Sequence, residues 1–185
     1  TGVKIMSINL MLQNEDDAVI WRGPLIASAI NQFWNDVFWG DLDALVVDMP
    51  PGTSDAALTV MQNLPVTGIV LVTSPQDLAG MVVRKAAHMA SHLETPLIGV
   101  VENMSYVICP HCGEHYSVFG EGDTKEMADA FNTNFLGEIG IDPEMAKLGD
   151  QGAIETYKSD DFSGVVEEVA EIVKAAPEPA FAGQA

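Results

Sequence analysis

Residues 42–55 read Leu-Asp-Ala-Leu-Val-Val-Asp-Met-Pro-Pro-Gly-Thr-Ser-Asp. The apolar run that ends at Asp48 is typical of a buried strand in a parallel sheet, and open α/β sheets bind ligands at the carboxyl ends of such strands. In a nucleoside triphosphatase, Asp48 would hold Mg²⁺ through a water molecule. Gly52 has no Cβ, so its amide could closely approach a γ-phosphate. The alternative is that Asp48 only caps the turn that follows the strand.

The size and composition of the chain indicate a globular protein. Its 185 residues are 48% hydrophobic and 19% charged, which suits one domain with a sizeable core. We expect a single domain over residues 1–176 and a flexible tail over 177–185. The apolar runs are too short to span a bilayer, and the first residues do not resemble a signal sequence.

The charge and the cysteine content exclude some partners and compartments. A net charge of −19 repels nucleic acid and anionic lipid, so we expect neither nucleic acid nor a membrane as a partner. Two cysteines, both in one Cys-x-x-Cys motif, do not suggest an oxidised secreted scaffold. A reducing cytoplasm is the expected compartment.

Strand-like and helix-like segments alternate along the chain, which predicts an α/β fold with a doubly wound, mostly parallel sheet. Asn103 comes directly after the fourth of the expected strands, at the ligand-binding edge. The expected strands cover 3–8, 42–48, 66–73, 96–102 and 135–141. The expected helices cover 23–40, 54–63, 74–93 and 162–173, with Ser54 and Ser74 as their possible caps.

The motif Cys109-Pro-His-Cys112 places two thiolates where they can bind one metal centre. A closed site usually needs about four ligands, so this pair requires an explanation. Two copies of the chain could each contribute Cys109 and Cys112 to a site on a two-fold axis. Alternatively, His111 or His115 could complete a structural zinc knuckle, or the pair could be a redox dithiol.

Seven motifs occur in an order that closely resembles the Mrp/ApbC-type P-loop ATPases, which are carriers or scaffolds for iron–sulfur clusters. The resemblance extends to about Tyr157 and rests on 21–24 (WRGP), 47–55 (VDMPPGTSD), 72–76 (VTSPQ), 102–105 (ENMS), 109–112 (CPHC), 119–122 (FGEG) and 135–139 (FLGEI). It implies a P-loop NTPase-like fold of the septum-site (MinD) and partition (ParA) group.

The resemblance also implies roles for single residues. Asp48 matches the Walker B acid, Gly52 the switch II glycine and Asn103 the residue that reads adenine. Cys109 and Cys112 match the pair that binds a [4Fe–4S] cluster bridged across a homodimer. The implied function of the complete protein is ATP-dependent assembly of this cluster and its transfer to apo-protein clients, with ATP and Mg²⁺ as cofactors.

The sequence also departs from the family pattern. It contains no glycine-rich lysine loop (Walker A), so it resembles the C-terminal two-thirds of a family member, and we expect the chain alone not to hydrolyse ATP. Gly140 stands where the family commonly has proline. Two other functions compete with this one: a positioning ATPase, which the acidic Glu167, Glu168 and Glu171 disfavour, and a non-catalytic zinc domain.

Overall fold

A computed structural model describes residues 2–14 and 16–176 of the chain, and the tail predicted over 177–185 lies outside them. The chain forms two compact units, residues 1–64 and residues 65–185. Each unit is described by itself. Among the described residues, no helix combines the length and the apolar character that crossing a membrane requires.

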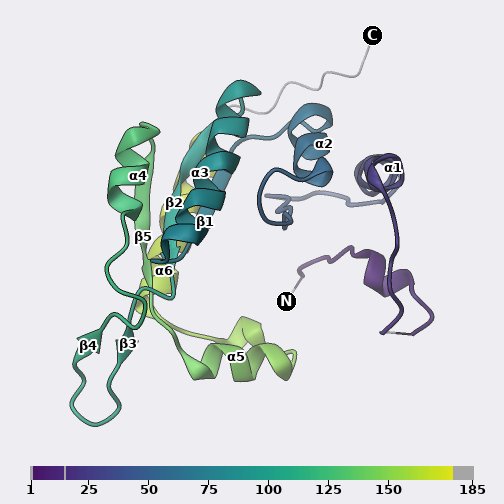
Figure 1. The fold of residues 1–185 in the computed structure, drawn as a ribbon. Coiled ribbons are helices and arrows are strands. Elements are labelled where there is room, and N and C mark those ends of the chain that lie inside the picture. Colours follow the sequence, from purple (N-terminus) through teal and green to yellow (C-terminus); the bar gives the residue numbers. More distant parts are fainter. Residues whose placement is uncertain (1, 15, 177–185) are drawn as a thin grey trace. The chain divides into compact units, whose positions relative to one another are not determined.

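The second unit is built on a three-stranded parallel sheet in the order β1-β2-β5 (Figure 1). Its strands are β1 (Ile69–Thr73), β2 (Leu97–Asn103) and β5 (Asn134–Ile139). Helix α3 (Asp77–His92) connects β1 to β2, and α4 (Thr124–Ala130) precedes β5. Helices on successive crossovers between parallel strands confirm the expected α/β class.

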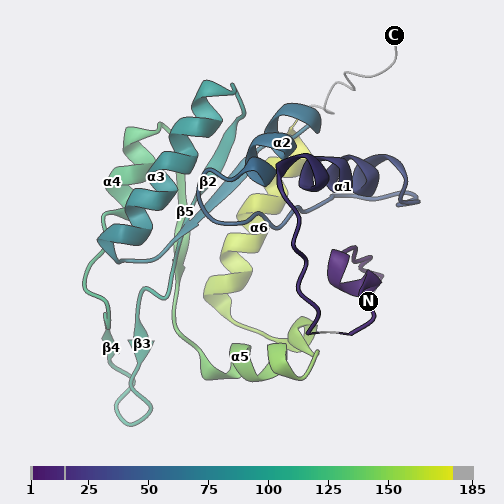
Figure 2. The ribbon, with the colours of Figure 1, turned by 45° about the vertical axis from the view of Figure 1, so that its right-hand side comes forward.

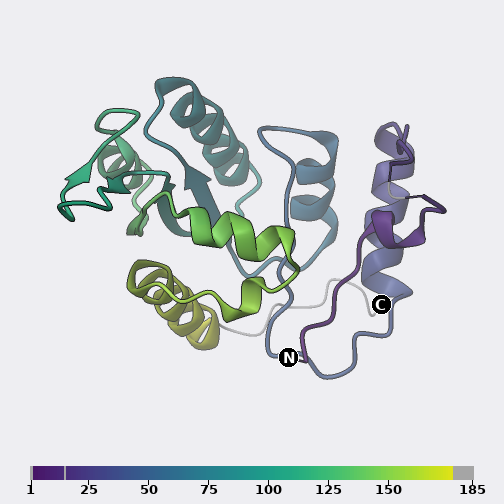
Figure 3. The same ribbon diagram turned by 90° about the horizontal axis from the view of Figure 1, so that it is seen from below.

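Helices cover both faces of this sheet (Figures 2 and 3). Neighbouring residues of β2 point to opposite faces, so Val100 packs with α3 and α4 whereas Val101 packs with α6 (Asp160–Ala175). The sheet is therefore doubly wound. The first core cluster contains Leu71, Ala87, Val100, Met127 and Ala128. The second contains Ile98, Val101, Leu136, Ile139 and Val165.

The start of α3 differs from the expectation. Its N-cap is Gln76, which makes no side-chain capping hydrogen bond, and not Ser74. The Ser74 hydroxyl donates instead to the side-chain oxygen of Gln76. The local cap signal was wrong because this contact occupies the serine side chain.

The first unit contains η1 (Ile8–Met11), α1 (Gly23–Asn35) and α2 (Asp55–Asn63). Ser54 caps α2 by accepting a hydrogen bond from the Ala57 amide at 3.2 Å, as predicted. Helix α1 starts at the predicted glycine but ends before Gly40. The two helices pack against each other.

Two strand predictions in this unit are wrong. The segments 3–8 and 42–48 contain no strand; the first leads into η1, which begins at Ile8, and the second is irregular. An apolar run becomes a strand only when its backbone pairs with a neighbour, and the described part of this unit contains no paired segment. Val46 is consequently 89% exposed.

Five elements of the second unit were not predicted. They are α4, β3 (Val107–Ile108), β4 (His115–Tyr116), α5 (Pro143–Asp150) and η2 (Ile154–Thr156). A local signal for α5 was present, because Asp142 caps it by accepting from the Glu144 amide at 2.8 Å and proline occupies its first turn.

Candidate functional site

The carboxyl end of β2 turns sharply into the segment that carries the cysteines. The Asn103 side chain accepts a hydrogen bond from the Met104 amide at 2.9 Å, and Met104 has a φ of +60°. The Ser105 amide then donates to the Ile139 carbonyl at 3.1 Å, which holds the turn against β5. Asn103 therefore stays at the sheet edge, half-buried, with its side chain folded over the turn.

The two cysteines lie on the connection of a short antiparallel hairpin. In this hairpin Val107 pairs with Tyr116, and Ile108 pairs with His115. The Cys109 amide donates to the Glu114 carbonyl at 2.9 Å, and the Gly113 amide donates to the Cys109 carbonyl at 2.9 Å. These bonds close a tight loop, in which Gly113 adopts a φ of +74°. The loop presents both thiols at the tip of the hairpin.

Both cysteines are free thiols, with Cys109 half-buried and Cys112 exposed. Hydrogen bonds from the backbone of Cys112, then the backbone of His111 and the side chain of Cys112, lower the pKa of the Cys109 thiol. A lower pKa favours the thiolate, which is the metal-binding form. Within the described residues, no group of three or more His, Cys, Asp and Glu side chains is arranged to hold a metal ion.

A buried carboxyl group lies at the base of the segment that carries the hairpin. Glu102 is 7% exposed and accepts hydrogen bonds from the hydroxyls of Ser105 and Thr124. Gly122 brings the returning chain against it, since a Cβ there would lie 2.2 Å from Glu102 Oε2 and 3.1 Å from the Pro75 Cα. Glu102 thus touches both the start and the end of the cysteine-bearing segment.

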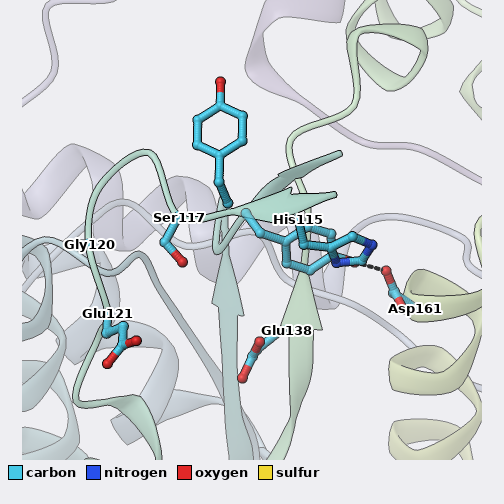
Figure 4. A pocket seen from close by; sticks show the side chains of 8 residues that line it. His115, Ser117, Gly120, Glu121, Glu138 and Asp161 are labelled. Carbon is cyan, nitrogen blue, oxygen red and sulfur yellow. Dashed lines mark hydrogen bonds between the residues drawn. The ribbon is translucent and has the colours of Figure 1, made fainter. Parts of the chain in front are cut away.

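An open hollow of about 830 Å³ adjoins the hairpin (Figure 4). Its lining includes the rings of Tyr106 and His115, which stack with centroids 4.6 Å apart, and the carboxylates of Glu121, Glu138 and Asp161. Tyr106 donates its hydroxyl hydrogen to Asp161, and burial followed by this bond raises the pKa of Tyr106 to about 12.

The ring of Tyr106 lies close to Gly140, the position at which the sequence departs from the family pattern. A Cβ at that position would lie 2.7 Å from Cε2 of the Tyr106 ring. The glycine leaves room for a ring that any larger residue would have to displace.

Asp48 and Gly52 lie in the first unit, on the irregular segment after α1. Asp48 is exposed, and Gly52 has a φ of +74°, a conformation that L side chains rarely adopt. Glycine suits this turn because of its backbone conformation, whether or not a phosphate also approaches it closely.

The structure brings together only part of the predicted site. Asn103, Cys109 and Cys112 share one segment after β2, whereas Asp48 and Gly52 belong to the other unit. Sequence reasoning missed Glu102, Tyr106, Thr124 and Asp161. The available signal for Glu102 was a charged residue at the end of an otherwise apolar strand.

Comparisons with known proteins identify the family of this chain. Residues 1–176 match the family described as ParA, NUBPL iron-transfer P-loop NTPase. An "Iron-sulfur cluster carrier protein" of Aquifex aeolicus is 47% identical over 151 residues, 82% of this chain and 42% of its own length. One from Saccharolobus solfataricus is 41% identical over 180 residues, 94% of this chain and 61% of that protein. The "Iron-sulfur cluster transfer protein NUBPL" of Dictyostelium discoideum is 44% identical over 151 residues, 82% of this chain and 46% of that protein.

The chain therefore spans only 42% to 61% of the length of these three relatives. Among solved structures, a nucleotide-binding protein from Archaeoglobus fulgidus in complex with ADP has 48% identity and a TM-score of 0.68 over 75% of this chain and 57% of its own. MinD of Aquifex aeolicus is 13% identical, with a TM-score of 0.55 over 88% of this chain and 65% of its own, a likeness of fold alone. The matched family covers nearly the whole chain, and this protein belongs to the NUBPL iron-transfer P-loop NTPases of the ParA group.

Proposed function

We propose that this chain carries the cluster-binding part of an iron–sulfur cluster carrier. In this proposal, two copies assemble a [4Fe–4S] cluster between them and transfer it to apo-protein clients in the cytoplasm. In the complete protein, ATP binding and hydrolysis accompany the process. The cluster is cargo, and the protein supplies the thiolates that hold and release it.

The observation that carries the proposal is the state of the cysteine pair. Cys109 and Cys112 are free, lie on the loop of an exposed hairpin and have no third ligand gathered around them within residues 2–14 and 16–176. Thiolates are suitable ligands for zinc and for iron–sulfur clusters, and a [4Fe–4S] cluster is held by about four of them. Two copies related by a two-fold axis would supply that number.

The surface beside the cysteines supports a second copy as the partner. Five large apolar side chains of this segment are 41% to 56% exposed: Met104, Ile108, Tyr116, Val118 and Phe119. A two-fold interface uses the same surface on both chains, so exposed apolar side chains beside an incomplete ligand pair suit a homodimer. The net charge of −19 opposes association, which makes this apolar contact and the shared cluster the forces that would hold the dimer.

For the nucleotide, we propose the roles that the family pattern implies. Asp48 would hold Mg²⁺ through water, Gly52 would approach the γ-phosphate and Asn103 would read the adenine edge. The open backbone of Gly52, with a φ of +74°, and the place of Asn103 at the carboxyl end of β2 support these roles. The carboxylate of Asp48 can accept a hydrogen bond from Mg²⁺-bound water, and the side-chain amide of Asn103 can hydrogen-bond a base edge.

Anaerobic reconstitution with iron and sulfide, followed by elemental analysis and measurement of molecular mass in solution, tests the proposal. A shared [4Fe–4S] cluster predicts about two iron and about two sulfide per chain in a dimer that separates when the cluster is removed. Zinc at about one per chain in a monomer would identify a structural zinc domain and refute the carrier function.

A further inference from the structure

We propose that Glu102 is the positioning residue of the cysteine pair. It closes the base of the cysteine-bearing loop and thereby fixes where Cys109 and Cys112 stand relative to the sheet. This inference rests on the proposed function for its purpose, but its geometry concerns the protein without metal.

Glu102 binds two hydroxyl groups that are far apart in the sequence. Ser105 lies three residues after Glu102, and Thr124 lies 22 residues after it, yet both hydroxyls donate to its carboxyl oxygens, one to each. All three side chains are buried, at 7%, 4% and 3% exposed for Glu102, Ser105 and Thr124. A carboxyl group this deep must have its lone pairs satisfied, and the two hydroxyls supply that.

The other contacts that hold the hairpin to the unit are weak. The hairpin has only two residues in each strand, and an isolated hairpin is marginal in water. Its outgoing arm is held by the Ser105 and Ile141 amides and by the Tyr106–Asp161 bond. At the end of the returning arm, the buried Thr124–Glu102 bond is accompanied by exposed ion pairs between Arg84 and Asp123 at 3.0 Å and between Lys125 and Glu138 at 3.1 Å. Lys125 also lies over the ring of Phe135.

Exposed ion pairs contribute little to stability, so the buried Thr124–Glu102 bond is the stronger hold on the returning arm. The missing Cβ of Gly122 is what allows that arm to lie against Glu102 Oε2. The same strand end carries Asn103 as its next residue. Glu102 therefore joins the cysteine loop to the sheet edge where the nucleotide is proposed to bind.

The test compares Glu102→Leu with Glu102→Gln. Leucine is of similar size but accepts no hydrogen bond, so both hydroxyls lose their partner. Glutamine can accept from one hydroxyl through its carbonyl oxygen and donate to the other through its amide, so it keeps both contacts. A matched control is Thr133→Val, which removes the bond from Thr133 to the Leu97 carbonyl (3.1 Å) at the opposite end of β2.

The readout is amide hydrogen exchange in the metal-free protein. We expect Glu102→Leu to speed exchange of the Cys109 and Gly113 amides by about tenfold relative to the β1–β2 ladder, and Glu102→Gln to leave them near wild type. Thr133→Val should not change this ratio. Faster exchange of hairpin and ladder together, as expected from a merely structural role, or an unchanged hairpin in Glu102→Leu, would overturn the proposal.

If Glu102→Leu fails to fold, Thr124→Val takes its place, because it removes one of the two donors at nearly constant shape. The same ratio, exchange of the hairpin amides relative to the β1–β2 ladder, then tests the proposal. Iron content after anaerobic reconstitution is measured in parallel, with Glu102→Leu expected to hold less iron than Glu102→Gln. If the wild-type chain binds no iron but Glu102→Leu still loosens the hairpin, the carrier function fails and the positioning role stands. If the wild type binds iron but Glu102→Leu leaves hairpin exchange unchanged, the positioning role fails and the carrier function stands.

Discussion

The phenol of Tyr106 donates a hydrogen bond to the carboxylate of Asp161, 55 residues further along the chain. The bond connects the segment that leads to the cysteines with the first turn of α6. Val165, further along α6, belongs to the second core cluster. Tyr106 also stacks on His115 of the hairpin. One aromatic side chain thus connects the core, α6 and the cysteine hairpin.

This contact predicts a dependence of stability on alkaline pH. Burial, and then the bond to Asp161, raise the pKa of Tyr106 from 10.0 to about 12, so the folded chain holds the phenol proton more tightly than the unfolded chain. Its contribution to stability is therefore complete below pH 10 and is lost as the pH rises from 10 to about 12. The ultraviolet absorbance of the phenolate follows this titration.

Two variants check the assignment. Tyr106→Phe should remove one late-titrating phenol from the spectrum, and Asp161→Asn should lower the pKa of Tyr106 because it removes the neighbouring negative charge. An unchanged titration in both variants would contradict the role assigned to this pair.

Gly122 is expected to tolerate no side chain. Its Cβ would meet Glu102 Oε2 at 2.2 Å and the Pro75 Cα at 3.1 Å, so Gly122→Ala should destabilise the protein by about 1–3 kcal/mol in urea unfolding. Gly164 lies within α6 and has nothing near its missing Cβ. Gly164→Ala is the matched control and should stabilise by about 0.5–1 kcal/mol. Equal effects at both glycines would argue against the close approach at Glu102.

Single substitutions discriminate a shared cluster from a zinc knuckle. Cys109→Ala or Cys112→Ala should each abolish iron binding, because every chain would lose one of its two ligands. His111→Ala and His115→Ala should retain iron, since neither imidazole is a ligand in the shared site. Metal content by elemental analysis measures all four. Loss of bound zinc in either histidine variant would instead support a closed site within one chain.

The purified chain should show no measurable ATP hydrolysis. Its sequence contains no glycine-rich lysine loop, so the triphosphate lacks the backbone amides and the lysine that balance its charge in P-loop enzymes. Release of phosphate from ATP with Mg²⁺ measures this, and Asp48→Asn is the control for a contaminating enzyme. Metal-dependent turnover that Asp48→Asn abolishes would show that the chain is active by itself.

Much of the second unit could be predicted because its signals are local or periodic. Apolar runs predicted β1 and β2, a strand over 135–141 was predicted where β5 lies, and the apolar residues of α6 recur with helical spacing. The hairpin was missed because two-residue strands carry no periodic signal. Ser74 misled because a serine before a helix can use its hydroxyl elsewhere, here on Gln76.

The sequence by itself determined which chemical groups are present and where several helices begin. Ser54 and Asp142 cap helices because the amides they serve lie within three residues of them. The Cys-x-x-Cys spacing likewise defined a possible ligand pair without any knowledge of the fold.

Only the tertiary structure decided what depends on distant partners. Residues 42–48 have the composition of a strand but form none, because a strand needs the backbone of a neighbour. Glu102 became the base of the cysteine loop because folding brings Thr124, 22 residues away, to its carboxyl group. A buried polar side chain takes its role from the groups that reach it, and the order of residues along the chain does not specify which groups those are.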